Sequence, residues 1–151
     1  MSMKTLPDPL SHRWPVARLT CMRTLLTALV VFHLIVSVMH GAAHSGARVF
    51  LPFAGNLFVY IVILAGPLAG LALSVWRPQA GAALVSLTMA GSFAFGVINH
   101  FIIPGSDHVA HVARDWRSLF AATAVLLACI EAAGTAIGFR LARRRTRRTS
   151  S

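Results

Sequence analysis

Four long apolar stretches take up most of this 151-residue chain. They run over residues 19–41, 53–75, 81–103 and 119–139. Each is long enough for a helix that crosses the hydrocarbon core of a bilayer, which takes about 20 residues. The remaining chain is too short for a soluble domain. We therefore expect a single membrane domain over residues 1–151, ending in a basic tail over residues 140–151.

The composition supports this membrane assignment. Hydrophobic residues make up 56% of the chain and charged residues 12%, whereas soluble domains carry roughly 25% charged residues. The four acidic residues are Asp8, Asp107, Asp115 and Glu131. No phosphate-binding loop, dinucleotide-binding glycine pattern or serine nucleophile elbow is present. We expect the bilayer to be the main partner and expect no binding to nucleic acid.

Helix breakers and short loops predict how the stretches are connected. Pro52 precedes the second stretch, Pro78 separates the second from the third, and Pro104 follows the third. Helices joined by short loops pack as antiparallel neighbours. We therefore predict an all-α integral membrane protein, an antiparallel up-down bundle of four transmembrane helices. Pro67 lies inside the second stretch and predicts a kink there, which membrane helices tolerate.

The basic residues predict the orientation of this bundle. Eleven lie on one side of a four-span topology: Lys4, Arg13, Arg18, Arg23, Arg77, Arg140, Arg143, Arg144, Arg145, Arg147 and Arg148. The other three, Arg48, Arg114 and Arg117, lie on the opposite side. Because basic residues accumulate on the cytoplasmic side, we predict a multi-pass protein of the cell membrane with both termini in the cytoplasm. The basic tail is expected to meet anionic lipid headgroups.

The start of the chain allows a second interpretation. Three arginines precede an apolar run over residues 25–39, and the small residues Gly41, Ala42 and Ala43 follow it. This order is typical of a secretory signal peptide, and cleavage after Ala43 would make His44 the new N-terminus. The apolar run extends to span length, which favours a retained first helix.

Five of the seven histidines fall on the predicted outer side: His40, His44, His100, His108 and His111. Imidazole is costly to bury in lipid and is the commonest transition-metal ligand, so this grouping indicates a binding site. At about 100° per residue, His33, His40 and His44 project from one stripe of the first helix, with His33 roughly 10 Å deeper. The i, i+4 spacing of His40 and His44 lets two imidazoles reach one ion.

The third loop adds further donors. Ser106 is a candidate N-cap, which predicts a short helix with Asp107, His108 and His111 in its first turns. Asp107 and His111 would then be i, i+4 neighbours, with the carboxylate acting as a ligand or as the partner that orients a histidine. We predict His40, His44 and His100 as the main ligands, followed by His108, His111 and Asp107.

Glu131 is the other buried candidate. It lies within the fourth stretch, roughly 20 Å from the outer face by helical rise. Carboxylates inside a membrane commonly serve proton or ion pathways. We predict that Glu131 and His33 form a proton relay.

Three functions are compatible with these residues, and no motif identifies a substrate or a reaction. The first is a site for Zn, Cu or Fe, with metal-dependent or redox activity if a coordination position stays open. The second is a redox protein that binds haem b between His100 and either His40 or His44. The third is a non-enzymatic accessory or scaffold subunit. It would join a second copy or a larger membrane complex through the GxxxG motifs at Gly66–Gly70 and Gly134–Gly138.

Overall fold

The computed structural model describes residues 13–144. Its helices are α1 (Arg13–Gly46), α2 (Phe53–Phe58), η1 (Val59–Ala65), α3 (Gly66–Trp76), α4 (Pro78–Val97), η2 (Ile98–Ile102) and α5 (Arg114–Ala142), where η marks a π-helical segment. No strand occurs between residues 13 and 144. The second apolar stretch is therefore a continuous run of α2, η1 and α3, and the third is α4 followed by η2.

Four segments are long and apolar enough to cross a membrane: Ala17–Gly46, Phe53–Trp76, Pro78–Ile102 and Arg114–Ala142. They coincide with the four predicted stretches, and the all-helical assignment is confirmed. The first continues past Gly41 because glycine inside a helix costs only about 1 kcal/mol and does not by itself end it. The fourth begins at Arg114, before the apolar run itself.

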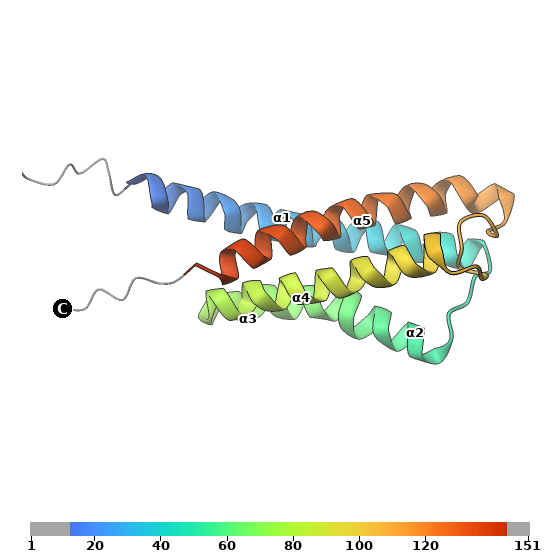
Figure 1. Ribbon diagram of the computed structural model, residues 1–151, viewed down its shortest axis with the longest axis horizontal. Coiled ribbons are helices and arrows are strands. Elements are labelled where there is room, and N and C mark those ends of the chain that lie inside the picture. Colours follow the sequence, from blue (N-terminus) through green and yellow to red (C-terminus); the bar gives the residue numbers. More distant parts are fainter. Residues whose placement is uncertain (1–12, 145–151) are drawn as a thin grey trace, which may run out of the picture.

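The spans lie side by side along the long axis of the molecule (Figure 1). α5 packs along α1 and along α4, and α4 also packs along α3. α1 and α3 touch only weakly. We call the end that contains the C-terminus of α1 and the N-terminus of α5 the histidine end, and the opposite end the tail end. The side between α1 and the second span is thus the least closed side of the molecule.

The second span is distorted near its middle. Pro67 lies in the first turn of α3, directly after η1. Proline lacks an N–H, and its ring would clash in a regular α-helix with the carbonyl four residues earlier, here that of Ile63. The π-helical turn around Ile63 accommodates both effects. The distortion predicted at Pro67 is therefore present as η1, and Figure 1 shows α2 diverging from the other helices toward the histidine end.

The tail half is packed through glycines. Gly66 and Gly70 of α3, and Gly134 and Gly138 of α5, all face α4. A Cβ at these positions would lie too close to atoms of Thr88, Val85, Met89 and Ala82, in that order. Both GxxxG motifs therefore serve close helix packing within the chain. Their use for docking onto another chain stays a prediction.

The third loop folds differently from the predicted short helix. Residues 103–113 form turns, in which the N–H of His108 donates to the Gly105 carbonyl at 3.2 Å and the N–H of His111 to the His108 carbonyl at 2.8 Å. The N–H of Val109 donates to the His100 carbonyl at 3.0 Å, so the loop folds back onto η2. A short helix is costly to start, because its first turn fixes many backbone dihedrals for one hydrogen bond. The hydrogen bonds of the turns and the contact with His100 form in place of that short helix.

Candidate metal centre

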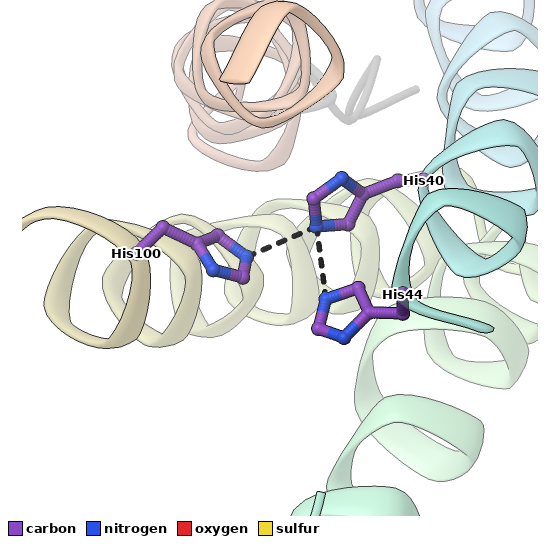
Figure 2. Close-up of side chains that lie close together, drawn as sticks. All are labelled: His40, His44 and His100. Carbon is purple, nitrogen blue, oxygen red and sulfur yellow. Dashed lines mark hydrogen bonds between the residues drawn. The ribbon is translucent and has the colours of Figure 1, made fainter. Parts of the chain in front are cut away.

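Three imidazoles meet at the histidine end (Figure 2). His40 and His44 come from the last turns of α1, and His100 comes from η2. The Nε2 atom of His40 lies 3.1 Å from Nε2 of His100 and 3.2 Å from Nε2 of His44. His40 and His100 are buried and His44 is half-buried. The structure thus brings together the three histidines that the sequence ranked first as ligands, and the group could hold a metal ion.

Local backbone structure sets these positions. The i, i+4 spacing places His40 and His44 one above the other on α1. His100 lies in the π-helical turn that ends the third span, where the N–H of Ile103 donates to the Ile98 carbonyl five residues earlier at 2.8 Å. π-Helical turns inside α-helices recur at functional sites because the inserted residue turns side chains toward a new direction.

Backbone oxygens fix the tautomers of His44 and His100. Nδ1 of His44 lies 3.4 Å from the Val49 carbonyl oxygen, and Nδ1 of His100 lies 3.1 Å from the Asp107 carbonyl oxygen. A carbonyl oxygen only accepts hydrogen bonds, so these contacts favour the tautomer in which each Nδ1 carries the proton. The Nε2 atom of each ring is then an unprotonated acceptor.

A threonine fixes the tautomer of His40. Nδ1 of His40 lies 2.8 Å from the Thr123 hydroxyl on α5. That hydroxyl donates its own hydrogen to the Leu119 carbonyl at 2.7 Å, or to the Phe120 carbonyl at 3.1 Å. Its oxygen is therefore the acceptor, and Nδ1 of His40 is the donor. As in the other two rings, Nε2 of His40 keeps its lone pair.

In these tautomers the Nε2 atom of each of the three rings carries a lone pair. Two nitrogens bound to one ion at about 2.0–2.1 Å and at a tetrahedral angle lie about 3.3 Å apart. The separations of Nε2 of His40 from Nε2 of His100 and of His44, 3.1 and 3.2 Å, are close to this value. Histidine ligands almost always donate their second ring N–H to an oxygen, as all three rings do here. The ligand atoms of the three rings lie within 4.8 Å of one another, and the group could hold one metal ion.

Asp107 lies beside the three histidines. Its Oδ1 atom is 3.3 Å from Nε2 of His44 and 3.3 Å from Nδ1 of His100. Both carboxylate oxygens are buried, and neither accepts a hydrogen bond from any residue in the described part of the chain. A buried carboxylate without donors is costly unless a cation is near. Asp107 is therefore a second observation that favours a cation site beside the three histidines.

The two remaining loop histidines lie outside this group. Their rings are 5.3 Å apart, and His111 is exposed. Nδ1 of His111 donates to the Gly105 carbonyl at 2.8 Å, whereas Nδ1 of His108 accepts from the Ala110 N–H at 3.2 Å. The predicted neighbours Asp107 and His111 are separated because the loop forms turns and directs Asp107 inward. A ligand role for His108 and His111 stays a prediction.

A second polar cluster lies deeper in the molecule. Nε2 of His33 on α1 is 3.0 Å from Oε1 of Glu131 on α5, and the Ser92 hydroxyl of α4 donates to the same oxygen. All three side chains are buried. The predicted contact between His33 and Glu131 is therefore present, although proton transfer through it stays a prediction.

Sequence reasoning missed Ser92 and Thr123. A periodicity could have found Thr123: it precedes Glu131 by eight residues on the fourth span, while His33 precedes His40 by seven on the first. Both pairs are about two helical turns apart, so two antiparallel helices can match them. Ser92 carries no comparable pattern.

A cavity of about 350 Å³ joins the two polar clusters. At the histidine end it is lined by the three histidines and Asp107, and deeper in the molecule by Ser92 and Glu131. The walls between them are mostly apolar and include Ile63, Leu64, Phe95 and Leu127. Small-molecule sites typically measure about 300–1,000 Å³ and place a few polar groups in an apolar wall.

Nitrogen-rich coordination with one carboxylate suits zinc, copper or iron and does not suit magnesium or calcium. The donor set could hold such an ion, and the cavity lies beside it. No protein-family model, curated protein or solved structure matches this chain.

Proposed function

We propose that this chain is a multi-pass membrane protein that binds one transition-metal ion through His40, His44 and His100. The convergence of three unprotonated Nε2 atoms carries the proposal. A proton placed between two imidazoles would relieve the repulsion of one pair only, whereas a cation at the centre relieves all three. The hydrogen bonds that hold each Nδ1 proton preorganise the site for the ion.

Asp107 has one of two roles in this site. As a fourth ligand it would close a tetrahedral site of three nitrogens and one oxygen. As the partner that orients His100, it would leave the fourth position facing the cavity, and an ion with an open position can support metal-dependent chemistry. In both roles its negative charge offsets part of the charge of a divalent ion.

The triad favours a single ion over haem b. Two axial nitrogens on opposite faces of a haem lie about 4 Å apart, twice a metal–nitrogen bond of about 2.0 Å. His40 and His100 are closer, at 3.1 Å. The imidazole of His44, 3.2 Å from His40, occupies space that a porphyrin plane would need. Accessory docking through GxxxG faces lacks such support because α4 already fills both motifs.

We further propose an up-down bundle with both termini in the cytoplasm. Arg48, Arg114 and Arg117 belong to the histidine end, and Arg140, Arg143 and Arg144 belong to the tail end. Lys4, His12, Arg145, Arg147 and Arg148 lie outside the described residues. The excess of basic residues supports this orientation, and contact of the tail with anionic lipid headgroups follows from it. The metal site would then face the outer side of the cell membrane.

Metal analysis of the purified protein tests the proposed site. After incubation with zinc and removal of excess, wild type should retain about one ion per chain, and a His40→Ala/His44→Ala double variant should retain almost none. His111→Ala is the matched control because it removes an imidazole outside the triad. Equal, negligible metal in all three proteins would overturn the proposal, as would a haem absorbance band that the double variant loses.

A further inference from the structure

The cavity opens on the least closed side of the molecule, between α1 and η1. Val38 of α1 and Tyr60 of η1 both line it, and they are 70% and 65% exposed. Both lie within segments that are long and apolar enough to cross a membrane. Tyr60 is seven residues into its span, about 10 Å from the start of the helix. In a bilayer, this opening faces acyl chains.

The cavity combines an apolar wall with one charged end. Among the described residues that line it, only Asp107 and Glu131 are acidic, and none is Lys or Arg. Glu131 already has two hydrogen-bond partners, His33 and Ser92. The Asp107 carboxylate accepts no hydrogen bond from the described residues. Of the two carboxylates, the one without a hydrogen-bond donor therefore lies at the histidine end, beside the proposed metal site.

Charge balance indicates what can occupy that end. A divalent ion with three neutral imidazoles and the Asp107 carboxylate carries a net charge of about +1, which is costly in an apolar cavity. One anionic oxygen donor at the open coordination position would neutralise the site. The apolar wall leading away toward the bilayer requires the rest of that ligand to be hydrocarbon.

We propose that the cavity binds a single-chain anionic lipid, such as a fatty carboxylate, that enters sideways from the bilayer. Its head group reaches the ion held by His40, His44 and His100, and its chain lies against Ile63, Leu64 and Leu127. This inference rests on the proposed metal site and specifies what the site binds.

Photo-crosslinking in lipid nanodiscs tests the inference. The probe is a palmitic acid analogue with a diazirine in its chain, and labelled peptides are mapped by mass spectrometry. Gly41→Leu should block the opening, because Gly41 lines the cavity and a Cβ there meets no atom within 4 Å. Ala42→Leu is the matched control, since its neighbouring position is exposed and does not line the cavity.

In wild type and Ala42→Leu, label should appear in residues 59–65 and 92–100 and should be displaced by unlabelled palmitate. Gly41→Leu should reduce this label about tenfold, equivalent to about 1.4 kcal/mol. Equal labelling of all three proteins would mean contact with surrounding lipid only and would overturn the inference.

Zinc is measured on the same samples so that the two proposals can fail separately. Gly41→Leu should keep its zinc while it loses the label. Removing zinc from wild type should weaken displacement by palmitate about tenfold. Displacement that is unchanged without zinc would refute the head-group contact, even if zinc binding itself is confirmed.

Discussion

The same four spans pack differently in the two halves of the molecule, the half toward the tail end and the half toward the histidine end. In the tail half, glycines let α3 and α5 approach α4 closely, and Leu26, Val30, Val85 and Met89 belong to the main buried cluster. In the histidine half, α2 diverges, two π-helical segments occur, and a mostly apolar cavity carries polar side chains at both of its ends. Glycines thus allow close packing in one half, while irregular backbone in the other half leaves room for the cavity and the candidate site.

The largest expected effect tests the deeper polar cluster, where the two halves meet. His33→Leu removes a partner of buried Glu131 and should lower the free energy of unfolding by about 3–5 kcal/mol. Replacing both residues, in His33→Leu/Glu131→Leu, should cost less than the single change because no unpaired carboxylate remains. Thermal or denaturant unfolding in detergent measures both. A double variant less stable than His33→Leu would contradict the pairing.

Overpacking the tail half should come next. Gly138→Leu forces a side chain against the Ala82 carbonyl and Ser86, and overpacking of this kind costs about 1–3 kcal/mol. The same change at Gly41, in the histidine half, meets open space and should cost far less. The midpoint of thermal unfolding compares the two variants. Equal losses at Gly138 and Gly41 would remove the distinction between a packed and an open half.

The third test concerns the metal site alone. Thr123→Val keeps the volume of the side chain but removes the acceptor for Nδ1–H of His40, so metal affinity should fall about 10–100-fold, equivalent to about 1.4–2.7 kcal/mol. Thr123→Ser restores the hydroxyl and should bind nearly as well as wild type. Titration with zinc and a competing chelator measures the affinities. If Val and Ser bind equally, the hydroxyl does not orient His40.

The smallest effect is expected at Arg48, in the loop at the histidine end. Its φ of 57° lies in the left-handed region, which costs a residue with a Cβ about 1–2 kcal/mol. Arg48→Gly removes that cost. Glycine also gives the unfolded chain more conformational entropy, which destabilises the folded protein by about 0.5–1 kcal/mol. The free energy of unfolding should therefore rise by about 0–1.5 kcal/mol, with zinc content unchanged. A loss of stability would show that the arginine side chain itself supports the loop.

The four helical spans could be predicted from hydropathy. In lipid every backbone N–H and C=O must form a hydrogen bond within the protein, and a helix satisfies these groups within a single segment. The stripe of His33, His40 and His44 follows equally directly from helical geometry. The approach of His100 required only that the first and third spans end at the same side. These features depend on local sequence or on connectivity alone.

The remaining features depend on contacts between helices. Asp107 reaches the site because the third loop forms turns, and a candidate N-cap at Ser106 gave the opposite indication. Thr123 reaches His40 only at the rotation that α5 adopts against α1. The cavity exists because α2 diverges ahead of Pro67, and a proline predicts a distortion but not its direction.

The hydrogen bonds His40–Thr123 and His33–Glu131 connect α1 to α5 at two levels, about 11 Å apart by helical rise. The two contacts together fix the register and the rotation of α1 against α5. Sliding either helix along the other, or turning it about its axis, separates the partners of at least one contact. One residue inserted between His33 and His40 would turn the upper level by about 100° relative to the lower. The seven-residue spacing of His33 and His40 thus specifies how α1 must be placed against α5 for both contacts to form.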